Sequence, residues 1–184
     1  MSCVLGLDLA PTLNGFAVGD GSSAPLAGAW ALPDCGPRLG QLARAHKAEL
    51  AALFRTHEIG AVCYESPILG RYDKLWTIRR IYGLGMITED FVKDWNEKTA
   101  AHVTCREVDL RTVKKQLSGA HDASKADMVY HARRLGIELP ATDVAGRKDA
   151  ADAVGVWLCG LKDHAPAAHA QWDAKLWLGR GRMI

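Results

Sequence analysis

Four acidic residues stand at positions where a carboxylate needs a partner. Asp8 interrupts an apolar segment, with a leucine on each side, and Glu65 closes a second apolar run. Asp149 and Asp152 lie three residues apart and would share one face of a helix. A buried carboxylate is costly unless it is paired or bound to a cation, and a divalent cation relieves repulsion between neighbouring acids. Such an all-oxygen set is typical of a Mg²⁺ or Mn²⁺ site.

Each of these acids also has a purely structural explanation. Asp8 can cap a turn, and Glu65 can pair with an arginine. Asp149 and Asp152 can favour a helix N-terminus. The metal-site hypothesis fails only if all of these structural explanations are correct at once. The explanation for Asp8 is the weakest of them. Neither a cap nor a surface position accounts for an acid inside a core strand.

The acids fall on segments whose patterns alternate between strand and helix. Strand patterns occupy residues 3–9, 16–18, 26–32, 59–64 and 103–108, and helical patterns occupy residues 38–57, 74–95, 110–117, 124–135 and 147–161. Asp8 then lies in the first strand, Glu65 at the carboxyl end of the fourth, and the Asp149 pair near the start of the last helix. This order predicts an α/β fold with one central sheet flanked by helices.

Length and composition indicate a single globular unit. The chain has 184 residues, of which 48% are apolar and 24% charged, which excludes disordered, collagenous and coiled-coil chains. We expect one domain over residues 1–165, followed by a partly ordered C-terminal tail over residues 166–184. Five cysteines without a Cys-x-x-Cys pair argue against disulfide or zinc frameworks. No apolar run approaches the roughly 18 residues of a membrane span and no secretory signal is visible, so we expect a cytoplasmic protein.

In chain order, several motifs resemble those of the RuvC-type Holliday junction resolvases, a family of the ribonuclease H-like superfamily. The resemblance extends over about 150 residues, which makes it more specific than any single motif. The motifs are Gly6-Leu7-Asp8 with Gly15 seven residues after the acid, Tyr64-Glu65, Val113-Lys114-Lys115, Ala123-Ser124-Lys125, and Asp149-Ala150-Ala151-Asp152-Ala153.

The resemblance implies a ribonuclease H-like fold with a five-stranded mixed central sheet. It also implies a metal-dependent, structure-selective DNA endonuclease that resolves four-way junctions by paired symmetrical nicks, leaving 5′-phosphate and 3′-hydroxyl ends. The four acids would hold two Mg²⁺ ions, with Mn²⁺ as a substitute. Lys114 or Lys125 would neutralise charge in the transition state.

Basic residues flank the proposed site and predict where branched DNA would bind. The alternative is that these residues only form the solvent-exposed face of a helix. Tyr72 could stack on an opened base. The predicted DNA-binding residues are Arg71, Tyr72, Lys74, Arg79, Arg80, Arg111, Lys114, Lys115 and Lys125.

The resemblance also implies a homodimer, with one site for each of two opposite strands. The helix predicted at 74–95 could form the interface through a stripe of Leu75, Ile78, Tyr82 and Met86. Core packing of that stripe is equally compatible with the sequence.

Two departures from the family's pattern make the chain more similar to phage-encoded relatives. Leu9-Ala10 replaces a Pro-Gly after the first acid, and Pro67, Ile68 and Leu69 stand where bacterial members carry a phenylalanine. Two other functions remain open on this basis. One is a broader nuclease that trims forks and flaps. The other is a non-catalytic DNA- or nucleotide-binding domain of the same fold.

Overall fold

The computed structural model describes residues 2–36, 38–67, 74–141 and 144–180, and its centre is a five-stranded sheet. The strands are β1 (Cys3–Asp8), β2 (Leu13–Gly19), β3 (Leu26–Ala31), β4 (Ile59–Glu65) and β5 (Thr104–Val108). Their order across the sheet is β3-β2-β1-β4-β5. The first three strands pair antiparallel, whereas β4 is parallel to both β1 and β5. The predicted mixed sheet is therefore confirmed.

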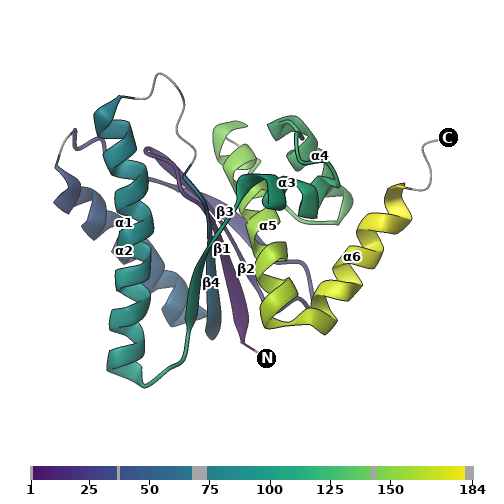
Figure 1. Ribbon diagram of the computed structural model, residues 1–184, viewed down its shortest axis with the longest axis horizontal. Coiled ribbons are helices and arrows are strands. Elements are labelled where there is room, and N and C mark those ends of the chain that lie inside the picture. Colours follow the sequence, from purple (N-terminus) through teal and green to yellow (C-terminus); the bar gives the residue numbers. More distant parts are fainter. Residues whose placement is uncertain (1, 37, 68–73, 142–143, 181–184) are drawn as a thin grey trace.

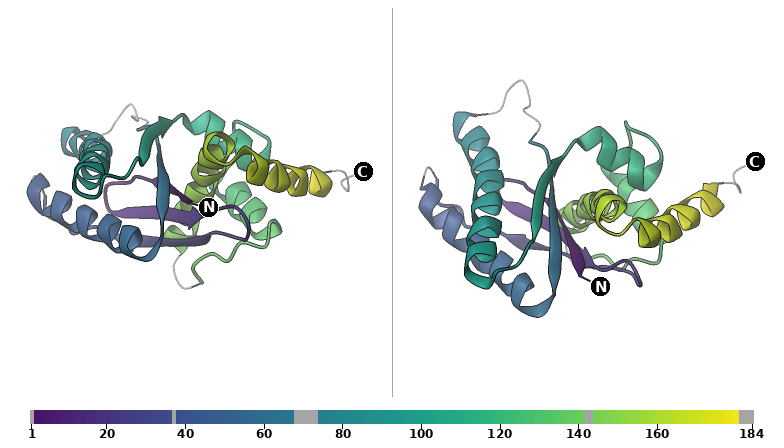
Figure 2. Two further views of the ribbon diagram at one scale, coloured as in Figure 1. Left: turned by 90° about the horizontal axis from the view of Figure 1, so that it is seen from below. Right: turned by 60° about the horizontal axis from the view of Figure 1, so that its bottom comes forward.

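Helices cover both faces of this sheet (Figure 1). They are α1 (Leu39–Thr56), α2 (Leu75–Thr99), α3 (Leu110–Ser118), α4 (Lys125–Arg134), α5 (Val144–His164) and α6 (Pro166–Arg180). Figures 1 and 2 show α1 and α2 on one side and the remaining helices on the other. Within the described part of the chain, no helix combines the length and the apolar composition needed to cross a membrane.

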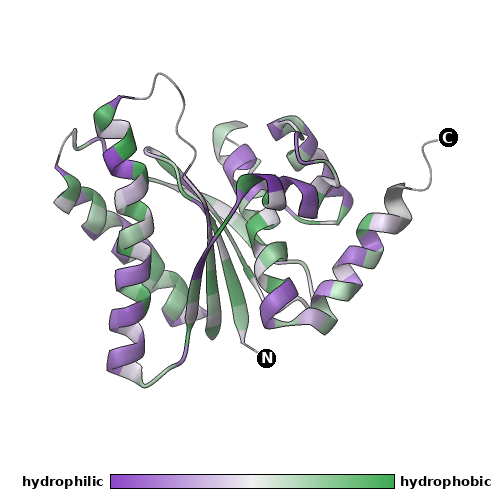
Figure 3. Ribbon diagram, in the orientation of Figure 1, coloured by the Kyte–Doolittle hydropathy of each residue, from purple (hydrophilic) through white to green (hydrophobic). Residues whose placement is uncertain are grey.

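Alternation along β1 sends its side chains to two different cores. Leu5 and Leu7 belong to the apolar cluster under α1 and α2, whereas Val4 belongs to the cluster under α5. Because side chains alternate with a period of two, Asp8 faces the same side of the sheet as Val4. Figure 3 shows the central strands as mostly apolar, so Asp8 ends a strand that is otherwise hydrophobic.

Helix α5 lies against the sheet at unusually short range. It contacts β1, β2, β3 and β4, and its residues from Ala150 to Leu158 are buried. Gly6 permits this approach, because a Cβ atom there would lie 2.6 Å from the carbonyl oxygen of Ala153. A Cβ at Gly15 would collide with the backbone of Asp149. Since Gly15 pairs with Asp8 across β1 and β2, this contact places the start of α5 next to Asp8.

The C-terminal segment forms a helix that the sequence analysis does not predict. Trp172 of α6 is buried, packs edge-to-face on Trp157 with ring centroids 5.4 Å apart, and donates from Nε1 to the carbonyl oxygen of Gly21 at 2.8 Å. Pro166 suits the first position of the helix, since it needs no amide donor there. Its buried residues Ala168, Trp172 and Leu176 lie four residues apart on one helical face, but most apolar residues of this segment are small alanines, which give a weak helical signal in the sequence. The domain boundary at residue 165 stays a prediction.

Substitution of Gly6 by alanine tests the close approach of α5. The new Cβ would meet backbone atoms of Ala153 and Trp157, which cannot rotate away, so we expect a loss of about 3 kcal/mol in the free energy of unfolding. Urea denaturation measures this loss. The matched control is Gly40→Ala in α1, where no atom lies within 4 Å and alanine is expected to stabilise the helix slightly. Equal stabilities for the two variants would contradict this packing.

Candidate metal centre

Three buried carboxylates meet where β1 ends and α5 begins. Asp8, Asp149 and Asp152 each offer one oxygen, and these oxygens lie within 4.8 Å of one another. Asp149 and Asp152 lie on one helical face, as their spacing predicts, and the contact between Gly15 and α5 brings that face to Asp8. Among the residues that the structure describes, no other group of three acids, histidines or cysteines is as compact.

Glu65 lies beside this cluster without belonging to the closest group. Strands β1 and β4 are parallel, and Leu7 pairs with Tyr64, so Asp8 and Glu65 are the next residues of adjacent strands. The carboxyl ends of parallel strands meet at one edge of a sheet. The charge of Glu65 raises the pKa of Asp8, and the charge of Asp152 raises that of Glu65.

Burial and like charge make the cluster retain protons. Burial, followed by the charges of Glu65 and Asp152, raises the pKa of Asp8 well above its ordinary value. Burial is also the main cause that raises the pKa of Glu65 to about 7 and the pKa of Asp152 above its usual range. Without a cation, part of the cluster stays protonated near neutral pH.

Lys125 forms ion pairs with two of the acids. Its Nζ donates to Asp149 Oδ1 at 2.9 Å and lies 3.2 Å from Asp152 Oδ2. Burial lowers the pKa of Lys125, but the hydrogen bond to Asp149 and the three aspartate charges raise it above its ordinary value. Ser124, the N-cap of α4, forms a capping box with Asp127 and sets the start of the helix at this lysine.

Lys114 and Asp109 act on the same site from α3. The positive charge of Lys114 lowers the pKa of both Glu65 and Asp152, so the two lysines predicted for the site both lie near it. Asp109 caps α3, since its Oδ2 accepts from the Thr112 amide. Its charge also raises the pKa of Glu65, a second effect that the sequence analysis does not anticipate.

Among the four acids, three carboxylate oxygens have no hydrogen-bond partner in the described part of the chain. They are Asp8 Oδ2, Glu65 Oε2 and Asp152 Oδ1, and all three are buried. Buried oxygens of this kind normally accept a hydrogen bond or bind a cation. Because they come from three different elements and belong to one acidic cluster, the donor set fits a hard divalent cation.

Most of the predicted DNA-binding residues lie at the surface of the described part of the chain. Lys74, Arg79, Arg111, Lys115 and Lys125 are exposed, and Lys114 is half-buried. Arg71 and Tyr72 lie outside the described residues.

Arg80 is placed differently from the prediction. It is fully buried, donates from Nη2 to the carbonyl oxygen of Pro33 at 2.9 Å, and lies over the ring of Trp76. Arg80 is one and two helical turns before Leu84 and Thr88, which face the core, so its position in the periodic pattern is that of a buried residue. Arg80 is therefore not part of an exposed DNA-binding surface.

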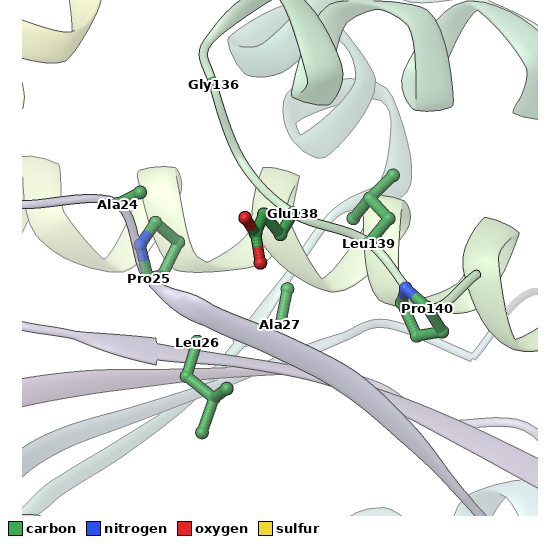
Figure 4. Close-up of a pocket in the computed structure, with 8 residues that line it drawn as sticks. All are labelled: Ala24, Pro25, Leu26, Ala27, Gly136, Glu138, Leu139 and Pro140. Atoms are coloured by element: carbon green, nitrogen blue, oxygen red, sulfur yellow. The ribbon is translucent and has the colours of Figure 1, made fainter.

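A groove lies elsewhere, between β3 and the loop that follows α4. Figure 4 shows its lining, with Ala24 to Ala27 on one side and Gly136, Glu138, Leu139 and Pro140 on the other, and its volume is about 540 Å³. Glu138 is the acid in this lining, and no member of the acidic cluster lines it. The groove is therefore separate from the acidic cluster.

The raised pKa of Glu65 predicts how stability depends on pH. The folded protein keeps this proton up to about pH 7, whereas the unfolded chain releases it near the ordinary value of 4.5. The contribution of Glu65 to the free energy of unfolding therefore falls as the pH rises through this window. Relative to the wild type, Glu65→Gln should gain about 1 to 3 kcal/mol between about pH 5 and about pH 8 in metal-free buffer.

Urea denaturation at several pH values in a chelating buffer measures this gain. The comparison with the wild type cancels the contribution of the buried His46, which is present in both proteins. The control is Asp122→Asn, which removes an exposed acid and should show no such trend. A stability difference between Glu65→Gln and the wild type that does not change with pH would contradict the electrostatics described above.

No family model and no curated protein matches the sequence. Solved structures that share its fold include the following three. RuvC from Thermus thermophilus is 21% identical, with a TM-score of 0.57 over 95% of this chain and 96% of that chain. The T. thermophilus RuvC complex with a Holliday junction substrate is 20% identical, with a TM-score of 0.59 and 96% of each chain covered. The yeast mitochondrial Holliday junction resolvase Ydc2 is 13% identical, with a TM-score of 0.58 over 97% of this chain and 81% of that chain. The chain therefore has the ribonuclease H-like fold of the RuvC-type resolvases, as its motifs predict.

Proposed function

We propose that the protein is a RuvC-type resolvase, a metal-dependent endonuclease that cuts four-way DNA junctions by paired symmetrical nicks. The observation that carries this proposal is the buried cluster of Asp8, Asp149 and Asp152, with Glu65 beside it, at the sheet edge of this fold. One structure with the same fold is a complex with a Holliday junction substrate. Such an enzyme acts in the cytoplasm of a bacterial or phage-host cell, where its DNA lies.

The four acids are the residues that would hold two divalent ions, Mg²⁺ in the first instance and Mn²⁺ as a substitute. Bound divalent ions lower the pKa of water and stabilise the attacking and leaving oxygens of a phosphodiester. Asp8 is the acid whose pKa responds to all three of the others, which supports its role as the shared ligand. The three unpartnered oxygens support binding through Asp8, Glu65 and Asp152.

Lys125 and Lys114 have a distinct part in this proposal. Lys125 is bonded to the acids on one side, and about half of its side chain is exposed on the other. Its ammonium group can therefore turn from Asp149 toward a phosphate oxygen when DNA binds. There it would donate a hydrogen bond and stabilise negative charge in the transition state. Lys114 reinforces the same positive field from the neighbouring helix.

Exposed basic residues lie on two helices. Arg111 and Lys115 lie on α3, and Lys74 and Arg79 lie at the start of α2. Phosphate contacts by such residues position DNA without reading its sequence. Because these contacts are to phosphates, the binding of DNA should weaken steeply as the salt concentration rises. Cleavage at the acidic centre would leave 5′-phosphate and 3′-hydroxyl ends.

Helix α2 supports the proposed homodimer. Leu75, Tyr82 and Met86 are 64%, 47% and 71% exposed, so the alternative of core packing does not describe these three residues. Large apolar side chains gathered along one exposed helix are typical of an interaction surface. A second copy bound there would provide the second active site that paired nicks require.

Cleavage of branched DNA tests the proposed activity. A labelled four-way junction, a Y-fork and a linear duplex are incubated with the wild type and with Asp8→Asn, with and without Mg²⁺. We expect paired symmetrical nicks on the junction that require Mg²⁺. Asp8→Asn should cut more than about 100-fold more slowly, since loss of a ligand exceeds the tenfold to hundredfold cost of an outer-shell partner.

The control for this experiment is Glu49→Gln, which removes an exposed acid on α1 and should cut like the wild type. Equal cutting of the fork would change the assignment to a broader branched-DNA nuclease. A junction that is bound but never cut with Mg²⁺ or Mn²⁺ would refute the proposed activity and leave a binding role.

Charge reversal on α2 tests the proposed dimer. Met86→Glu should produce a monomer in sedimentation equilibrium, because two buried carboxylates would face each other across a symmetric interface. Nicks made by that monomer should no longer be paired. The control is Tyr130→Glu, which places the same charge at an exposed aromatic residue on α4. A wild-type protein that is monomeric at micromolar concentration, or a Met86→Glu variant that remains dimeric, is incompatible with this interface.

A further inference from the structure

A chain of buried polar groups crosses the other face of the sheet, under α1 and α2. Asn14, His46 and Thr88 are fully buried and come from β2, α1 and α2. Asn14 Nδ2 lies 3.1 Å from His46 Nδ1, and His46 Nε2 lies 2.9 Å from Thr88 Oγ1. At one end, Asn14 Oδ1 accepts from the amide of Ala10 at 2.9 Å, and at the other, Thr88 donates to the carbonyl oxygen of Leu84 at 2.8 Å.

The two backbone ends determine the direction of every hydrogen bond in this chain. The Ala10 amide can only donate, so the amide oxygen of Asn14 accepts and its nitrogen donates to His46 Nδ1. The Thr88 hydroxyl gives its proton to a carbonyl oxygen, so it accepts from a protonated His46 Nε2. His46 is therefore neutral, with its proton on Nε2. Burial lowers its pKa to about 4, which agrees with a neutral ring.

The chain of hydrogen bonds begins at the turn that follows Asp8. Ala10 is two residues beyond Asp8, and Asn14 immediately precedes Gly15, the residue that pairs with Asp8 in β2. The Asn14 side chain thus closes the turn between β1 and β2 by binding its backbone. His46 in turn fixes the orientation of the Asn14 amide.

The other end of this chain of hydrogen bonds lies on α2. Thr88 is two residues after Met86, so the hydrogen bond from His46 joins the turn to the helix that carries the exposed apolar residues. A strand end that is held only by its own turn is free to shift. The end of β1 is instead connected to α1 and α2 through the buried hydrogen bonds of His46 with Asn14 and Thr88. Hydrogen bonds in such an environment are costly to break, because each leaves a buried group without a partner.

We propose that Asn14, His46 and Thr88 are positioning residues that hold the turn after Asp8, and with it the Asp8 carboxylate, in the geometry that binds the metal ions. This inference rests on the proposed function in one respect, the role of Asp8 as a metal ligand. A purely structural role would predict a loss of stability alone. A positioning role also predicts weaker metal binding by protein that remains folded.

The test compares Thr88→Val with Thr99→Val. Both threonines are on α2 and donate to a carbonyl oxygen four residues earlier, but Thr99 accepts nothing from a histidine and is exposed. The measurements are Mn²⁺ affinity by electron paramagnetic resonance and hydrogen exchange of the Ala10 amide by NMR, on protein whose fold is checked by circular dichroism. We expect Thr88→Val to bind Mn²⁺ about tenfold more weakly and to exchange the Ala10 amide faster. Thr99→Val should match the wild type in both.

His46→Gln is the second variant, and it covers the case in which Thr88→Val does not fold. Glutamine keeps one acceptor for Asn14 and one donor for Thr88, so we expect Mn²⁺ affinity within about threefold of the wild type. A folded Thr88→Val with wild-type affinity would overturn the proposal, and so would a folded His46→Gln whose Ala10 amide is deprotected while its affinity is unchanged. Nitrogen-15 spectra of wild-type His46 that place the proton on Nδ1 would do the same.

The failure of this proposal is distinguishable from the failure of the proposed function. Wild-type protein that binds Mn²⁺ but never cuts a junction would refute the nuclease activity, while the positioning of Asp8 would stand on the Mn²⁺ measurements. Wild-type protein that cuts junctions, together with a Thr88→Val variant that binds Mn²⁺ equally well, would refute only the positioning role. Wild-type protein that binds no Mn²⁺ would overturn both.

Discussion

Repulsion between buried carboxylates is the constraint on which the arrangement of this molecule depends. Asp8, Asp149 and Asp152 offer oxygens within 4.8 Å of one another, and Glu65 adds its charge from the adjacent strand. Lys125 offsets part of this charge, yet three oxygens of the group lack a partner. A fold that holds such a group together must do so through contacts elsewhere, since the acids themselves favour separation.

Those contacts come from the packing of α5 and from the strand edge. The glycines at positions 6 and 15 let the helix backbone reach the sheet, and the apolar residues of α5 are buried there. The parallel pairing of β1 and β4 aligns Asp8 with Glu65. Each acid is thus held by a strand or a helix rather than by a loop, which gives the cluster the rigidity that the proposed metal site would require.

Much of this arrangement is predictable from local patterns. Asp8 stands out because an acid within an apolar strand has few explanations, and the three-residue spacing of Asp149 and Asp152 specifies a shared helical face. Arg80 shows the limit of this reasoning, because a run of basic residues indicates charge but not which member turns inward. Helix α6 and the Asn14–His46–Thr88 chain depend on contacts between distant segments, such as Trp172 with Gly21 and His46 with Thr88, which no local pattern encodes.

The most direct test of the central claim is anomalous scattering from a crystal soaked in Mn²⁺. We predict strong anomalous peaks within coordination distance of the carboxylates of Asp8, Asp149 and Asp152, with Glu65 as a ligand from the adjacent strand. Crystals of Asp8→Asn should lose these peaks while the surrounding backbone is unchanged. A wild-type crystal that shows Mn²⁺ only at other acids, or none at this centre, with Lys125 still bonded to Asp149, would contradict the account.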